Sequence, residues 1–198
     1  MKPLPAALAA LSLALAVPAG AKTPAASELP ALFAALEKAG AVVEGAASPG
    51  HILYVFFDAN CWYCHLTWKA LQPYEKAGLQ VRWVPVAYQK DSSTGRAAAI
   101  MQAKDRAAAL RENETRYRAQ SYDGGIAPAR ASKAFLAQLD ANFELMDRFG
   151  LSGTPGLAWK DAGGKVRTLL GMPRLSRLPA ITGLPEQKIG DPELAEFR

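Results

Sequence analysis

The chain contains two cysteines, Cys61 and Cys64, which are separated by two residues in the segment FFDANCWYCHLTW, residues 56–68, and are followed at once by His65. Three kinds of chemistry use a C-x-x-C pair. The pair can form a reversible disulfide, supply half of a zinc site or, with the histidine that follows, attach a haem. The surrounding residues have to distinguish a redox site from a metal or haem site.

Zinc and haem both need ligands beyond the cysteine pair. A structural zinc ion takes four ligands, and the chain offers two histidines, His51 and His65, of which His51 opens a strand-like segment. The haem alternative is stronger, because C-W-Y-C-H matches the c-type attachment motif and would make His65 the proximal ligand. Three methionines could supply the other axial ligand: Met101, Met146 and Met172. An apolar strand leads directly into the first cysteine, however, which suits an α/β site better than a haem pocket.

The position of the pair in the chain favours the redox interpretation. The preceding segment HILYVFF, residues 51–57, is apolar and rich in β-branched and aromatic residues, which is typical of a strand buried on both faces. If the strand ends near Asp58 and a helix begins at the motif, Cys61 lies at the helix N-terminus, where free N–H groups and the helix dipole favour a thiolate. Cys64, one turn later, can then attack a mixed disulfide formed on Cys61.

A second segment, SGTPG at residues 152–156, supports a redox site. Its Thr154–Pro155 step lies between a predicted helix and a predicted strand, where an ordinary turn is one interpretation. A cis peptide bond is the other, although cis costs about 0.5–1 kcal/mol at an X–Pro bond. A cis Pro155 would expose the backbone of Thr154 beside Cys61, where an extended substrate segment could pair with it.

The remaining segments indicate alternating helices and strands. Residues 27–40 have apolar residues at helical spacing, with Ser27 as the expected N-cap. Residues 92–150 form an Ala-rich helical block that we expect to be split near Asp105 and at DGGIAP, with Ser132 capping its last helix. Further expected elements are a short strand in 41–50, a helix after Cys61, a strand in 79–88, a hairpin in 156–171, a short helix at about 175–181 and a loosely ordered tail from 185.

This order of elements predicts the fold class. A strand–helix–strand unit around the motif requires a crossover and a parallel pair, while the hairpin adds antiparallel strands. We therefore expect an α/β chain of thioredoxin-like fold, with a helical insertion at about 92–150 between the C-x-x-C unit and the cis-Pro hairpin. The expected parts are a short N-terminal helix and linker in 22–50, a catalytic domain in 51–184 and a polar C-terminal tail in 185–198.

The first 21 residues have the composition of a secretory signal peptide. Lys2 supplies the basic start, an apolar run covers 4–17, and small residues suit cleavage after Ala21. A retained membrane anchor is the weaker alternative, because the run is short for a bilayer. Export would let the cysteine pair oxidise. Removing Lys2 leaves 22 basic and 18 acidic side chains, and their interspersed pattern disfavours nucleic-acid binding.

Together, FFDANCWYCHLTW, the helical insertion, GTPGLAW and LLGMP resemble the catalytic domain of DsbC/DsbG-type periplasmic thiol:disulfide interchange proteins, and DsbG most closely. The resemblance covers roughly residues 51–184. It implies that Cys61 attacks, that Cys64 resolves, and that Thr154 precedes a cis Pro155. It also implies a periplasmic reductase or isomerase that acts on cysteines of exported proteins and is kept reduced by a membrane reductase of the DsbD type. Because the two cysteines carry the proposed exchange, we expect no metal or organic cofactor.

The chain departs from this family in two respects. After the expected signal peptide, only about 30 residues, from Lys22 to His51, stand where the family carries an N-terminal dimerisation domain and a linker helix. We therefore expect a monomer or weak dimer instead of the usual V-shaped homodimer. The dipeptide Trp62-Tyr63 replaces the more frequent proline-containing pairs, and both residues are candidate substrate contacts, as are Thr154 and Pro155. A DsbA-like oxidase, a non-redox chaperone-like binding protein and a c-type haem protein remain the alternatives.

Two residues next to the motif are possible modulators. His65 could stabilise the Cys61 thiolate or relay a proton, or it could be a half-exposed helical residue without a role. Asp58 could accept a proton from Cys64, or it could merely cap the helix.

Overall fold

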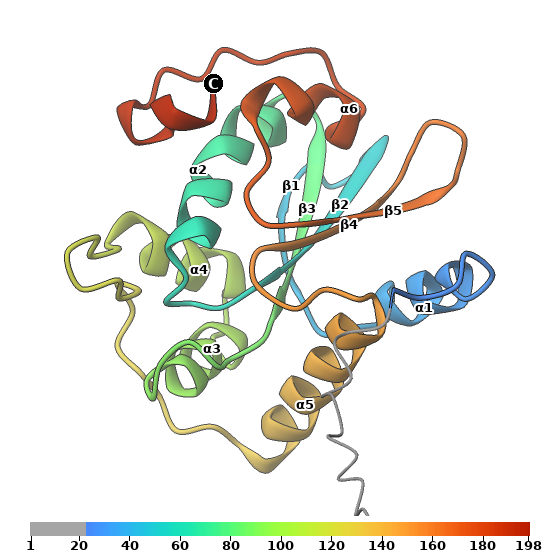
Figure 1. The fold of residues 1–198 in the computed structure, drawn as a ribbon. Coiled ribbons are helices and arrows are strands. Elements are labelled where there is room, and N and C mark those ends of the chain that lie inside the picture. Colours follow the sequence, from blue (N-terminus) through green and yellow to red (C-terminus); the bar gives the residue numbers. More distant parts are fainter. Residues whose placement is uncertain (1–22) are drawn as a thin grey trace, which may run out of the picture.

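The computed structural model describes residues 23–198, so the predicted signal peptide, residues 1–21, lies outside the described residues. A five-stranded sheet with strand order β1-β3-β2-β4-β5 forms its centre (Figure 1). The strands are β1 (Val42–Gly45), β2 (His51–Phe57), β3 (Leu79–Pro85), β4 (Gly156–Lys160) and β5 (Val166–Leu170). The helices are α1 (Leu29–Leu36), α2 (Trp62–Lys76), α3 (Ser93–Met101), α4 (Arg106–Thr115), α5 (Lys133–Arg148) and α6 (Leu178–Thr182), with short 3-10 turns η1 (Leu175–Arg177) and η2 (Pro192–Phe197). This arrangement confirms the predicted thioredoxin-like fold.

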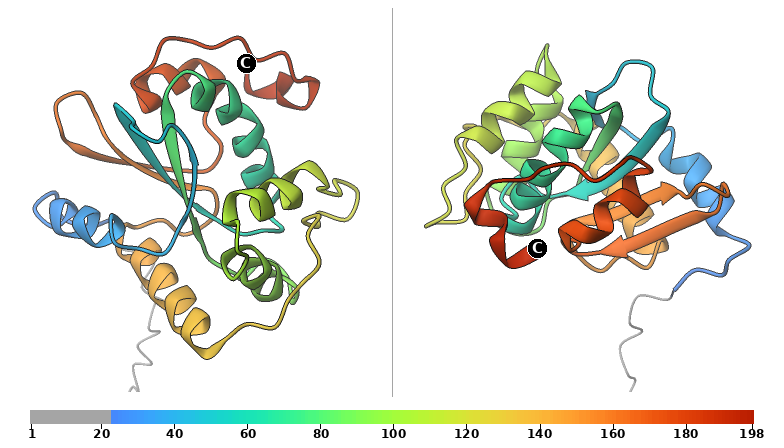
Figure 2. Two further views of the ribbon diagram at one scale, coloured as in Figure 1. Left: turned by 180° about the vertical axis from the view of Figure 1, so that it is seen from behind. Right: turned by 90° about the horizontal axis from the view of Figure 1, so that it is seen from above.

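The central strand β2 is buried on both faces, as its sequence predicts. Its side chains alternate between two hydrophobic clusters, with Leu53, Val55 and Phe57 in one and Tyr54 and Phe56 in the other. The first cluster includes residues of α2 and α4, and the second includes residues of α1 and α5, so helices cover both sides of the sheet (Figure 2). Because β2 is packed on both faces, the turn that follows it and the start of α2 are held in a fixed position.

The pairing of the strands agrees with the predicted connections. β2 and β3 pair in parallel, with Val55 opposite Trp83, because α2 carries the chain back across the sheet between them. β4 pairs antiparallel with both β2 and β5, and β4 and β5 form the predicted hairpin. Both the C-x-x-C motif after β2 and the segment before β4 therefore lie at the same end of the sheet.

The helical insertion is divided as predicted. Asp105 caps α4, because its side chain accepts a hydrogen bond from the N–H of Ala108 at 2.9 Å. Ser132 caps α5 by accepting from the N–H of Phe135 at 3.2 Å. The predicted cap at Ser27 is wrong: α1 begins at Leu29, its N-cap residue is Glu28, and the Glu28 side chain forms no capping hydrogen bond.

The C-terminal segment is not loosely ordered, which corrects the expectation from its polar composition. The turn η2 packs against α2, and the side chain of Leu194 is completely buried. Lys69 of α2 forms an ion pair with Asp191 at 2.7 Å. Leu194 and this ion pair are among the contacts that hold the segment in place, although its composition is that of a polar tail. Within the described residues, no helix is both long and apolar enough to cross a membrane.

Candidate redox site

Cys61 is the N-cap residue of α2. The turn after β2 places it there, because the N–H of Cys61 donates to the carbonyl oxygen of Asp58 at 3.0 Å and its backbone is extended, not helical. Its Sγ atom accepts a hydrogen bond from the N–H of Cys64 at 3.3 Å. A sulfur in this position satisfies one of the free N–H groups of the first helical turn, and a negative charge on it is stabilised by the helix dipole.

The two thiols differ in their tendency to ionise. The pKa of Cys61 is lowered, mainly by a hydrogen bond from the Cys64 side chain. The Thr154 side chain and the Cys64 N–H also lower it, whereas burial acts to raise it. Burial raises the pKa of Cys64 well above its ordinary value, and its hydrogen bond to Cys61 adds to this. Both cysteines are free thiols. The geometry thus makes Cys61 the more nucleophilic thiol and keeps Cys64 protonated.

The segment before β4 completes this site. The Thr154–Pro155 peptide bond is cis, and the Cys61 thiol donates a hydrogen bond to the carbonyl oxygen of Thr154 at 3.4 Å. The hydroxyl groups of Thr154 and Tyr88 lie 3.1 Å apart. Two segments far apart in the sequence therefore meet at the sulfur of Cys61, where the sequence predicts a substrate-binding backbone.

Asp58 does not cap α2, because Cys61 occupies that position. The Asp58 carboxylate is buried and accepts four hydrogen bonds, two to each oxygen. One oxygen accepts from the Ser93 hydroxyl at 2.8 Å and the Asn60 N–H at 2.9 Å, and the other from the N–H groups of Tyr88 at 2.8 Å and Gln89 at 3.0 Å. Asp58 thereby connects the end of β2 to the loop that carries Tyr88. Its carboxylate oxygens are engaged with these donors.

His65 is buried, not half-exposed as one interpretation of the sequence expects. Its Nδ1 atom lies 3.0 Å from Glu114 Oε2, and its Nε2 atom lies 3.8 Å from Glu193 Oε2. The imidazole stacks on the ring of Tyr117, with centroids 4.5 Å apart. Both nitrogens face carboxylates and one ring face is covered, so this histidine does not fit the role of an axial haem ligand. Its hydrogen-bonding partner is Glu114, not the Cys61 sulfur.

The two residues inside the motif have different surroundings. Trp62 is partly buried and packs against Tyr117 and Tyr122, with ring centroids 5.7 and 6.3 Å apart. Tyr63 is 51% exposed and meets the ring of Phe197 edge-on at 6.3 Å. Tyr63 thus presents an accessible aromatic surface beside the cysteines, while much of Trp62 is used in packing.

Several residues of the site were not identified from the sequence. Asn60, Asn113, Glu114 and Tyr117 surround the motif, and the side chains of the first three are almost entirely buried. The one sequence feature that points to them is the polar run NETRY, residues 113–117, at the end of an Ala-rich helix. Periodicity alone does not reveal that these polar groups face the active-site loop, because a solvated helix face has the same pattern.

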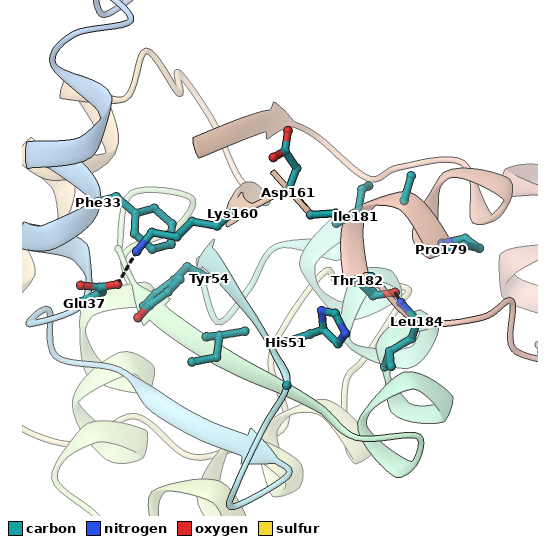
Figure 3. A pocket seen from close by; sticks show the side chains of 15 residues that line it. Phe33, Glu37, His51, Tyr54, Lys160, Asp161, Pro179, Ile181, Thr182 and Leu184 are labelled. Carbon is teal, nitrogen blue, oxygen red and sulfur yellow. Dashed lines mark hydrogen bonds and ion pairs between the residues drawn. The ribbon is translucent and has the colours of Figure 1, made fainter. Parts of the chain in front are cut away.

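A cavity of about 670 Å³ lies at the other end of β2 (Figure 3). Its lining includes His51, Tyr54 and Ile181, and an ion pair between Glu37 and Lys160 at 3.0 Å borders it. Because β2 begins at this cavity and ends before Cys61, the cavity is separate from the redox site. Within residues 23–198, no group of three or more His, Cys, Asp or Glu side chains is arranged to hold a metal ion.

The strand–C-x-x-C–helix unit and the cis Thr-Pro segment beside it are the defining features of one fold family. The chain belongs to this family, the thioredoxin-like domain family, whose model matches residues 36–181.

Two curated proteins show which thioredoxin-like proteins the chain resembles in sequence. The chain is 31% identical over 139 residues to the thiol:disulfide interchange protein DsbG of Pseudomonas aeruginosa, covering 69% of this chain and 53% of that protein. It is also 31% identical over 109 residues to DsbC of Haemophilus influenzae, covering 54% and 43%. The resemblance to DsbC/DsbG-type proteins is therefore confirmed, and the chain spans about half the length of these curated relatives.

Solved structures support the same fold. ScsC of Proteus mirabilis superposes with a TM-score of 0.64 at 21% identity, covering 80% of this chain and 78% of that one. DsbA2 of Pseudomonas aeruginosa superposes with a TM-score of 0.55 at 15% identity, covering 70% and 90%. At these identities the likeness concerns the fold alone.

Proposed function

We propose that this protein is a periplasmic thiol–disulfide oxidoreductase of the reductase or isomerase type, acting on cysteines of other exported proteins. The observation that carries the proposal is the position of the Cys61 sulfur. It caps α2, accepts the Cys64 N–H at 3.3 Å, and lies beside the backbone of Thr154. The confirmed resemblance to DsbG and DsbC supports the same chemistry.

The reaction follows from the different surroundings of the two thiols. The Cys61 thiolate attacks one sulfur of a substrate disulfide, so that a Cys61–substrate disulfide forms and the other substrate sulfur leaves as a thiolate. Cys64 then attacks the Cys61 sulfur, and its proton goes to the sulfur that leaves. The substrate departs with two thiols, and the protein is left with a Cys61–Cys64 disulfide. With a sulfenic acid as substrate, the same attack releases water after protonation.

Regeneration needs an outside reductant, because each reductive turnover oxidises the pair. We propose a membrane reductase of the DsbD type for this step, as the family resemblance implies, and a monomer or weak dimer as the working state. Thr154, Pro155, Trp62 and Tyr63 are the proposed substrate contacts. The exposed ring of Tyr63 and the Thr154 carbonyl beside Cys61 support this assignment.

One observation favours a second candidate, a DsbA-like oxidase on the same fold. Hydrogen bonds lower the pKa of Cys61 and so stabilise the reduced form of the pair, which makes its disulfide a stronger oxidant. The two candidates share the site and the steps, and they differ in the direction of electron flow. Equilibration with glutathione buffers, followed by separation of the reduced and oxidised forms, distinguishes them.

The proposal is tested by replacing the resolving cysteine. Cys64→Ala should accumulate mixed disulfides between Cys61 and exported proteins, which reductant dissolves, because nothing then attacks the Cys61 sulfur. The matched control, Cys61→Ala/Cys64→Ala, should form none. If Cys64→Ala forms no adducts while Cys61 remains reactive toward a small alkylating agent, the mechanism is wrong. Binding of unfolded segments that persists in the double variant would instead indicate a chaperone-like protein.

A further inference from the structure

The end of α4 and the segment immediately after it, which contains Tyr117, contact the backbone just before Cys61. The side-chain amide of Asn113 donates to the carbonyl oxygen of Ala59 at 3.0 Å. The hydroxyl of Tyr117 donates to the carbonyl oxygen of Asn60 at 2.7 Å. Two consecutive carbonyl groups, which belong to the turn that sets the direction of Cys61, are thereby held by the helical insertion. Because Asn113 is completely buried, its hydrogen bonds do not compete with solvent.

The same segment contacts the residue immediately after Cys64. Oε2 of Glu114 lies 3.0 Å from Nδ1 of His65, and Oε1 accepts from the Asn113 amide at 3.0 Å. The ring of Tyr117 stacks on His65 at an interplanar angle of 12°. The contacts before Cys61 and after Cys64 are therefore connected to each other through the Asn113–Glu114 hydrogen bond.

The loop that follows α4 closes over these contacts. The N–H of Gly124 donates to the side chain of Asn60 at 3.0 Å, and the N–H of Gly125 donates to the carbonyl oxygen of Asn113 at 2.8 Å. A Cβ atom on Gly124 would lie 2.2 Å from Asn113 Oδ1 and 2.4 Å from the carbonyl oxygen of Ala59. Such close approach excludes any side chain at Gly124 without a local shift.

From this arrangement we propose that Asn113, Glu114 and Tyr117, here called the α4 clamp, are positioning residues that set the dithiol–disulfide equilibrium of Cys61 and Cys64. The inference rests on the proposed redox function. The clamp holds the backbone on both sides of the motif in the conformation in which the Cys64 N–H reaches the Cys61 sulfur. That contact stabilises the thiolate of the reduced pair, so a loosened clamp favours the disulfide.

Two conservative variants test the clamp. Tyr117→Phe removes the hydroxyl but keeps the ring on His65, and Glu114→Gln removes the charge but keeps the shape. Each should shift the glutathione equilibrium toward the Cys61–Cys64 disulfide by about three- to tenfold, the effect of losing or weakening one buried or partly buried hydrogen bond. Each should also raise the pKa of Cys61, measured by thiolate absorbance against pH. Glu112→Gln is the matched control, because Glu112 lies in the same helix but forms an exposed pair with Arg116.

The outcomes separate the clamp from the proposed function. If the unaltered protein forms no reversible Cys61–Cys64 disulfide, the redox function itself fails. If it does, but Tyr117→Phe has the same equilibrium and the same Cys61 pKa, the clamp is merely structural and the inference is overturned. A shift toward the dithiol, or an equal shift in Glu112→Gln, also overturns it. Tyr117→Phe decides the matter if Glu114→Gln does not fold.

Discussion

The thiol of Cys61 donates a hydrogen bond to the carbonyl oxygen of Thr154 at 3.4 Å, across 93 positions of the sequence. This bond exists only while Cys61 carries its proton. When the thiol ionises, the Thr154 carbonyl loses this donor and is free to accept a hydrogen bond from another N–H group, such as that of the proposed substrate segment. Loss of the Cys61 proton therefore also frees the Thr154 carbonyl oxygen to accept another hydrogen bond.

The hydroxyl of Thr154 should contribute to the reactivity of Cys61. The Thr154 side chain helps to lower the Cys61 pKa, so Thr154→Val, which keeps the shape of the side chain, should raise that pKa. Alkylation of Cys61 at neutral pH should slow about two- to fivefold, as expected for one lost hydrogen bond. The rate of iodoacetamide reaction as a function of pH, with peptide mapping, measures this. Thr168→Val on exposed β5 is the control, and equal rates in both variants would contradict the prediction.

Glu75 should make the stability of the protein depend on pH. Burial, with a contribution from the charge of Glu44, raises the pKa of Glu75 to about 8, against an ordinary value of 4.5. The folded state therefore favours protonated Glu75. The contribution of Glu75 to folding stability is complete below about pH 4.5 and is lost as the pH rises toward 8. Compared with the unaltered protein, Glu75→Gln should gain about 1–3 kcal/mol more free energy of unfolding at pH 8 than at pH 5.

Urea unfolding of this variant at both pH values tests the prediction, since the midpoint and slope give the free energy. Gln72 donates a hydrogen bond to Glu75 at 3.4 Å, and the amide oxygen of the introduced glutamine can still accept it in the variant. The ion pair of Glu44 with Arg111, at 3.5 Å, is also kept. Glu144→Gln, on an exposed part of α5, should show no such difference. A Glu75→Gln profile parallel to that of the unaltered protein would show that Glu75 ionises normally.

Leu194 should anchor the C-terminal segment to α2. Its side chain is completely buried, so Leu194→Ala should lower the free energy of unfolding by about 2–4 kcal/mol, through lost burial and a residual cavity. Leu136→Ala, at a 40% exposed position of α5, should cost much less. Thermal and urea unfolding of the two variants provide the comparison. Equal stabilities would mean that the segment is not held in place in solution.

Much of the fold and the centre of the site could be predicted from local sequence. The continuous apolar run of β2, the capping side chains of Asp105 and Ser132, and the hairpin of β4 and β5 are short-range signals. Their physical causes act within a few residues, so the residues themselves reveal them. The N-cap position of Cys61 belongs to this group, because it requires only a strand that ends and a helix that begins.

The burial of His65, the order of the C-terminal segment and the α4 clamp could not be predicted in this way. Each depends on which polar groups of a distant segment face inward, and a helix such as α4 carries polar residues on both its solvated and its buried side. A polar side chain becomes buried only where a specific partner satisfies it, as Glu114 does for His65. That partner is defined by packing and not by spacing.

Local sequence is enough to specify a pair of cysteines at the start of a helix after a buried strand, because strand, turn and N-cap are adjacent in the chain. The tertiary structure decided what surrounds their sulfurs, since Thr154, Glu114 and Tyr117 reach the motif only when the sheet and the insertion have packed together. Local free energies select the elements, whereas the contacts that tune a thiol arise from long-range packing.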